Sequence, residues 1–106
     1  MTTSSDTKAL VAERGKTHGA FEDHAAATQR LKSAFYREHG KRQARNQTPL
    51  SETQLEAVEM ILHKLGRIVA GDPNFADHWD DIAGYAVIAN RTKATNPPPP
   101  LDGDED

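Results

Sequence analysis

The densest chemistry in the sequence lies between residues 77 and 85, which read Asp-His-Trp-Asp-Asp-Ile-Ala-Gly-Tyr. Asp77 is followed by Asp80 three residues later and by Asp81 four residues later. On a helix these spacings stack two carboxylates on one side, where they repel each other. A cation between them removes the repulsion, and oxygen ligands of this kind suit Mg²⁺ or Mn²⁺. Asp77, Asp80 and Asp81 are therefore candidate metal ligands.

The same acids also have a purely structural interpretation. Carboxylates in the first turns of a helix are favoured by the helix dipole. Asp80 or Asp81 can also pair with Lys64 or Arg67 of the preceding helix, if the two helices pack antiparallel. Asp81 adjoins the apolar side of its helix, so we expect it to be the most buried of the three acids.

A second set of polar residues follows one stripe of the helix before. Glu56, Glu59 and His63 are spaced by three and four residues, which places them on a single helix side. Glu56 and Glu59 are candidate catalytic residues, acting as a base or as metal ligands. Lys64 and Arg67, near the end of the helix, are candidate phosphate ligands. A solvated face with acids first and bases last is the alternative, because it suits the dipole equally well.

A third candidate is the segment Arg14-Gly-Lys-Thr-His-Gly19, in which two glycines frame basic side chains. A glycine-framed loop can expose backbone N–H groups to an anion, which makes Arg14, Lys16 and His18 candidate phosphate ligands. The segment is not a Walker motif, because it lacks the spacing and the preceding strand. The basic run at residues 37–45 has no regular aromatic interleaving, so we do not expect nucleic-acid binding.

These residues need helices to position them. Apolar residues recur at helical spacing between Leu55 and Val69, and Ser51 with Gln54 forms a capping-box pattern at the start. The pattern predicts an antiparallel hairpin of helices at about 51–71 and 74–91. Asp72 or Asn74 is the expected cap of the second of these helices.

The rest of the predicted fold is also helical. We expect a long helix at about 20–39 packed across the hairpin, a short N-terminal helix at 6–13, and a mobile basic loop at 41–47. The fold class is therefore an all-α small helical bundle. In domain terms, residues 1–5 are expected to be disordered, residues 6–93 to form one helical domain, and residues 94–106 to form a disordered, proline-rich acidic tail.

Composition limits the function further. The chain has 106 residues and no cysteine, which removes disulfides, zinc-thiolate sites and thiol nucleophiles. It has no apolar run of membrane-spanning length and no signal-peptide pattern, so we expect a soluble, cytoplasmic protein without a membrane partner. A core this small makes a homodimer one of the expected partners.

The motifs together resemble a known kind of protein. Glu13-Arg14-Gly15, His63-Lys64-Leu65 and the Asp80-Asp81-Ile-Ala-Gly-Tyr85 motif near the C-terminus look like a small phage and prophage family of unassigned function. That family is distantly similar to the all-α MazG-like nucleoside triphosphate pyrophosphohydrolases. The resemblance covers about residues 10–90.

The resemblance implies a site and a reaction. MazG-like enzymes carry a Glu-x-x-Glu pair on one helix and a Glu-x-x-Asp pair on the next, which hold Mg²⁺ on the triphosphate. Glu56-x-x-Glu59 matches the first pair, and Asp77-x-x-Asp80 or His78-x-x-Asp81 stands at the second.

The expected function is binding of a nucleotide or related phosphorylated small molecule, with Mg²⁺- or Mn²⁺-dependent hydrolysis to the monophosphate and pyrophosphate if the protein is an enzyme. The alternative is a non-catalytic phage-type protein that binds a host protein or sequesters a signalling nucleotide in the bacterial cytoplasm.

Overall fold

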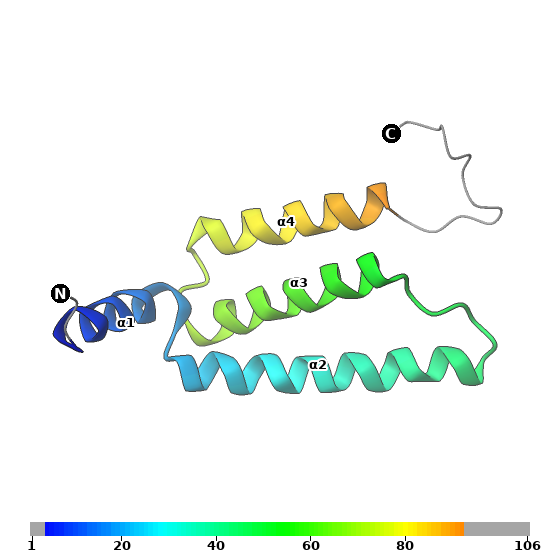
Figure 1. Ribbon diagram of the computed structural model, residues 1–106, viewed down its shortest axis with the longest axis horizontal. Coiled ribbons are helices and arrows are strands. Elements are labelled where there is room, and N and C mark those ends of the chain that lie inside the picture. Colours follow the sequence, from blue (N-terminus) through cyan, green and yellow to red (C-terminus); the bar gives the residue numbers. More distant parts are fainter. Residues whose placement is uncertain (1–3, 93–106) are drawn as a thin grey trace.

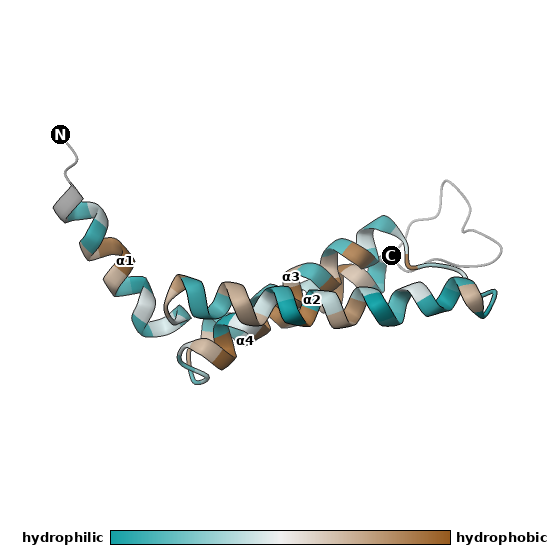
Figure 2. Cartoon of the chain, turned by 90° about the horizontal axis from the view of Figure 1, so that it is seen from below, coloured by the Kyte–Doolittle hydropathy of each residue, from teal (hydrophilic) through white to brown (hydrophobic). Residues whose placement is uncertain are grey.

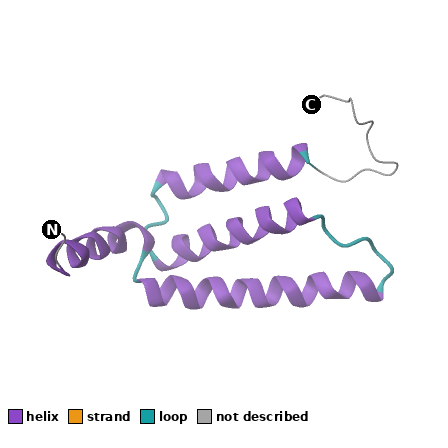
Figure 3. Cartoon of the chain, in the orientation of Figure 1, coloured by secondary structure: helices purple, strands orange, loops and turns teal. Residues whose placement is uncertain are grey.

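The computed structural model describes residues 4–92, and these form an all-α fold, as predicted (Figures 1 and 3). Its helices are α1 (Ser4–His18), α2 (Phe21–Ala44), α3 (Glu52–Ala70) and α4 (Ala76–Arg91). Within the described residues, no helix combines the length and apolar character that a bilayer crossing needs. The predicted acidic tail at 94–106 and most of the predicted disordered start at 1–5 lie outside the residues described.

The start of α3 confirms the capping-box prediction. The Gln54 N–H donates to Ser51 Oγ at 3.1 Å, and the Ser51 N–H donates to Gln54 Oε1 at 2.9 Å. Two backbone N–H groups that a helix start leaves without partners are satisfied in this way. Local sequence therefore determines where the central helix begins.

α3 lies at the centre of a flat layer. It packs against α2 on one side and α4 on the other, while α2 and α4 make no contact with each other among the described residues. Figure 1 shows the three helices side by side, and Figure 2, turned by 90°, shows them overlapping in one band with α1 projecting from its end. The helix predicted to pack across the hairpin therefore lies alongside α3 instead.

Helices α1 and α2 are both longer than predicted, because glycine does not end them. Residues 14–18 of the expected loop at 14–19 belong to the end of α1, and residues 41–44 of the expected loop at 41–47 form the last turn of α2. Gly15 and Gly40 lie inside these helices, where glycine costs about 1 kcal/mol relative to alanine and is tolerated. α1 ends only at Gly19, whose φ of 81° breaks the helix.

The start of α4 also differs from the prediction. Its N-cap is Phe75, which has an extended backbone and no capping side chain. Asp72 instead accepts a hydrogen bond from the Asn74 N–H at 2.9 Å, within the turn that precedes the helix. An Asx-type turn is a common alternative use of aspartate beside a proline.

Candidate functional site

The last turn of α1 is fixed to the turn between α3 and α4. The Thr17 carbonyl oxygen accepts the Asp72 N–H at 2.9 Å and His78 Nε2 at 3.0 Å. Because a carbonyl oxygen can only accept, Nε2 of His78 carries a hydrogen. The His78 side chain is 1% exposed, which makes it the most buried large residue described. One carbonyl therefore orients α1 over the base of the helix layer.

Beside this joint lies a pocket of about 330 Å³, a volume within the range of small-molecule sites. α1, α2 and α3 each contribute to its lining, with the short link between α1 and α2 closing one side. The lining residues are Val11, Arg14, Gly15, His18, Gly19, Ala20, Phe21, His24, His63 and Arg67. Among the residues that the structure describes, no acidic side chain lines it.

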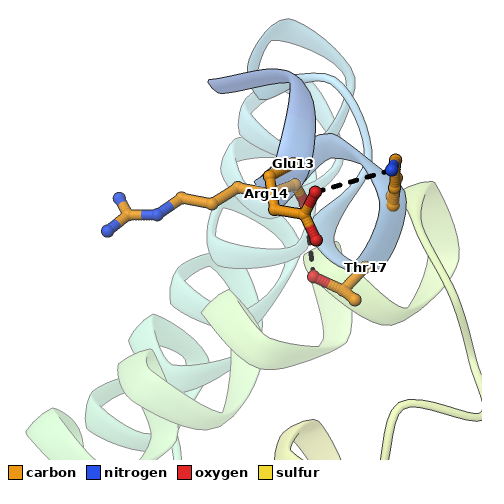
Figure 4. Close-up of polar contacts among 4 residues, drawn as sticks. Glu13, Arg14 and Thr17 are labelled. Atoms are coloured by element: carbon orange, nitrogen blue, oxygen red, sulfur yellow. Dashed lines mark hydrogen bonds and ion pairs between the residues drawn. The ribbon is translucent and has the colours of Figure 1, made fainter. Parts of the chain in front are cut away.

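Two guanidinium groups give the pocket its positive charge. Burial lowers the pKa of Arg67, and the charge of Arg14 lowers it further, while Asp81 acts in the opposite direction. Nε of Arg67 is buried without a hydrogen-bond partner, and so is Nδ1 of His24. Figure 4 shows the Arg14 side chain extending away from Glu13 and Thr17. Buried donors without partners cost free energy, and an anion in the pocket would satisfy them.

Histidines form much of the remaining polar lining. The rings of His24 and His63 meet edge to face at 6.0 Å between centroids, and those of His18 and His78 at 5.0 Å. Burial, with Arg67 as the next cause, lowers the pKa of His18 to about 4. The same two causes lower the pKa of His24 and of His63. Near neutral pH the imidazoles of His18, His24 and His63 are therefore mostly uncharged, so each can both donate and accept a hydrogen bond.

The lowered histidine pKa values predict acid sensitivity. His18 has a folded pKa of about 4 against an ordinary 6.5, so the unfolded chain binds the proton more tightly. The stability that uncharged His18 contributes to the fold is therefore fully present above about pH 6.5 and is lost as the pH falls towards 4. We expect His18 to account for a loss of about 1–2 kcal/mol between pH 7 and pH 5, after allowance for solvent screening. Urea unfolding of wild type and of His18→Asn at both pH values measures this, and an equal pH dependence in the two proteins would contradict it.

The structure separates the five residues predicted to bind phosphate. Arg14, His18 and Arg67 line the same pocket. Lys16 lies outside the lining, in an exposed ion pair with Glu13 at 3.5 Å (Figure 4). Lys64 also lies outside it, 2.8 Å from Asp81 Oδ2. The loop that was expected to supply free N–H groups is helical, so the anion-binding capacity here comes from side chains.

The three acids of α4 do not gather into one cluster among the described residues. Asp77, Asp80 and Asp81 are all exposed. Asp81 is instead held by Lys64, which lowers its pKa through a hydrogen bond and through its charge. Within residues 4–92, no group of three or more histidine or acidic side chains is placed to hold a metal ion. Binding of Mg²⁺ or Mn²⁺ by one or two of these carboxylates stays a prediction.

The predicted catalytic glutamates also lie apart from the pocket. Glu56 and Glu59 are on α3, but neither is among the lining residues. Glu56 is seven residues before His63, which corresponds to about 10 Å along the helix. The spacing correctly placed His63 and Arg67 on one side of α3, but the pocket forms only where α1 covers the end of that side.

Residues that the sequence reasoning missed as ligands are Phe21, His24 and His63. Phe21 is 69% exposed, and its ring contacts that of His24 edge to face at 5.1 Å. One sequence feature links His24 to the buried side of α2. It lies four residues before Thr28, so the two share one side of the helix, and both are buried. Nothing in the local sequence links it to His63, because that contact depends on helix packing.

Comparison of the sequence with known protein families finds one match. A family model described as a domain of unknown function, DUF6378, matches residues 4–93. The chain belongs to this family. The DUF6378 match spans all four helices, so the pocket lies wholly within the shared domain. No curated protein and no solved structure matches the chain. DUF6378 membership carries no activity with it, and the resemblance to MazG-like enzymes stays a hypothesis.

Proposed function

We propose that this protein binds a phosphorylated small molecule in the pocket between α1, α2 and α3, with a nucleotide as the first ligand class to test. The observation that carries the proposal is that Arg14 and Arg67 line the same pocket, with no acidic side chain among its described lining residues. Two guanidinium groups without a carboxylate between them repel each other, and a phosphate group relieves that repulsion through charge-assisted hydrogen bonds.

The apolar lining suits the organic part of such a ligand. Phe21 exposes most of its ring and Val11 is 62% exposed, and both line the pocket. Flat aromatic surfaces of this kind stack on nucleobases. A volume of about 330 Å³ also exceeds what a lone phosphate group would fill. Phosphate at the arginines and a base over Phe21 would use both parts of the lining.

The pocket supports binding more than it supports hydrolysis. The carboxylates predicted to hold metal or act as a base lie elsewhere, so no hydrolytic step follows from the pocket residues. A protein that holds a nucleotide without turnover is the version that this arrangement favours. This agrees with the role of sequestering a signalling nucleotide, which a phage-encoded protein could perform in a bacterial cytoplasm.

Arg14→Gln tests the proposal. Arg14 is exposed, so its replacement should leave the fold intact. We expect calorimetric titration with nucleoside mono- and triphosphates to show an affinity loss of about 10- to 150-fold, because a charge-assisted hydrogen bond contributes about 1.5–3 kcal/mol. Lys16→Gln is the matched control on the same helix and should bind as wild type does. Phe21→Ala should weaken nucleotide binding but leave the binding of inorganic phosphate unchanged.

The same titrations, repeated with and without Mg²⁺ and followed by a pyrophosphate assay, separate binding from hydrolysis. Equal affinities for wild type and Arg14→Gln would exclude the pocket as the binding site. Pyrophosphate release that depends on Mg²⁺ and is lost in Asp77→Asn would instead support the alternative that the protein is a pyrophosphohydrolase.

A further inference from the structure

The side of the helix layer opposite the pocket is largely apolar, and no other helix among residues 4–92 covers it. On α3, Gly66 faces α2 and Lys64 faces α4, as their contacts with Thr28 and Asp81 show. At about 100° per residue, the side between these directions that does not carry the pocket residues is apolar from Leu55 to Val69, after Gln54 in the first turn. It consists of Val58, Ile61, Leu62, Leu65 and Val69.

α4 continues this apolar surface. Asp81 marks the pocket side of α4, because it contacts Lys64 there. Trp79, Val87 and two alanines lie about 120° or more around the helix from Asp81, on the opposite side. Small residues at the corresponding positions of α2 complete what we call the apolar face. Its members outside α3 are Ala27, Leu31 and Ala34 of α2 and Trp79, Ala83, Ala86 and Val87 of α4.

Several residues of the apolar face are highly exposed, and few of the described apolar side chains are buried. Val69 is 70% exposed, Val87 is 55% exposed and Trp79 is 50% exposed. Among the described residues, only Ala57 and Ile68 are buried apolar side chains. A helical domain normally buries its apolar stripe between two layers of structure, and here the described residues form one. The stripe of α3 needs a second layer.

The face has the size and character of one half of a homodimer interface. α3 has 19 residues, which span about 28 Å, and three helices side by side at about 9 Å make a face of roughly 800 Å². A standard interface buries about 800 Å² on each partner. No charged residue interrupts the α3 stripe between Leu55 and Val69, Asp80 borders the α4 stripe beside Val87, and the alanines let two layers approach closely. An apolar patch of this kind is complementary to itself, as a two-fold interface requires.

We propose that the apolar face packs against the same face of a second copy, so that two three-helix layers stack into a six-helix homodimer. A second copy suits the face better than a foreign protein does, because the missing layer is needed for the chain's own core and another copy is present wherever the chain is made. The pocket lies on the outer side of each layer and stays open in the dimer.

Light scattering coupled to size exclusion tests the proposal on the full chain. Wild type should have the mass of a dimer, and Val69→Glu combined with Val87→Glu should raise the dimer dissociation constant by about a hundredfold or more, because each carboxylate enters a desolvated interface. Ile88→Glu is the matched control. Ile88 is 41% exposed but lies on the Asp81 side of α4, so this variant should remain a dimer. A monomeric wild type, or a double variant that stays dimeric, would overturn the proposal.

A second measurement tests the proposal without the glutamate variants, which matters if those variants fail to fold. Trp79 is the only tryptophan and lies on the apolar face, so dilution of wild type should shift its fluorescence to the red as the dimer dissociates. The chain has no cysteine, so Val87→Cys and Ile88→Cys each carry a single thiol. The thiol at 87 should react several-fold more slowly with iodoacetamide in the dimer than the thiol at 88. Equal reactivity of the two thiols would place the contact elsewhere.

Discussion

Replacing Gly19 by alanine is expected to lower the free energy of unfolding by about 3 kcal/mol or more. Gly19 has a φ of 81°, a conformation that disfavours any residue with a Cβ atom. A Cβ at this position would also collide with the backbone carbonyl of Ala70, at the end of α3. Backbone atoms cannot turn aside as a flexible side chain can, so α1 and α3 would have to separate.

Thermal or urea unfolding of Gly19→Ala measures this loss, and a fall in melting temperature of more than about 10 °C is expected. Gly84→Ala is the matched control. Gly84 lies inside α4 with nothing within 4 Å of its added Cβ, so alanine there should stabilise by about 0.5–1 kcal/mol. If both variants shifted stability in the same direction, the close approach of α1 to the end of α3 would be wrong.

His78→Ala is expected to have the second largest effect, a loss of about 3 kcal/mol. The side chain is buried to 1% exposure, and its ring packs against Phe75 at 4.9 Å between centroids. Alanine removes those contacts and leaves a cavity, and it also removes the hydrogen bond to the Thr17 carbonyl oxygen. Because that bond holds α1 in place, the pocket that α1 covers should lose affinity for ligand as well.

His78→Gln separates the two contributions. A glutamine amide can donate to the Thr17 oxygen roughly as Nε2 does, so this variant should lose only about half as much stability as alanine does. Urea unfolding of both variants gives the comparison. A His78→Ala protein within 0.5 kcal/mol of wild type, an estimate of the usual scatter for surface positions, would show that the residue is not needed to fix α1.

The helical elements of this protein were largely predictable, because short-range features determine them. Ser51 and Gln54 fixed the start of α3, and the spacing of apolar residues from Leu55 to Val69 fixed its extent and character. Helix ends were predicted less well where glycine was the only signal. Gly15 and Gly40 sit inside helices while Gly19 ends one, and only the surroundings of each glycine decide which occurs.

The candidate site was predicted in part. Arg14, His18 and Arg67 were identified by residue type and do come together, while Lys16 and Lys64 found acidic partners of their own at Glu13 and Asp81. A charged side chain becomes a ligand residue or half of an ion pair according to which neighbour packing brings near it. That choice is made between helices, so spacing within a helix cannot reveal it.

Sequence by itself determined that this chain is helical, where its central helix begins, and which residue types could meet a phosphate. Tertiary structure decided that α3 is flanked by α2 and α4 in a single layer, that the acids of α4 face water, and that histidines from three helices gather around Arg67. The reason is that hydrogen bonds and apolar periodicity act within a few residues, whereas a pocket and an uncovered face arise only when distant helices pack together.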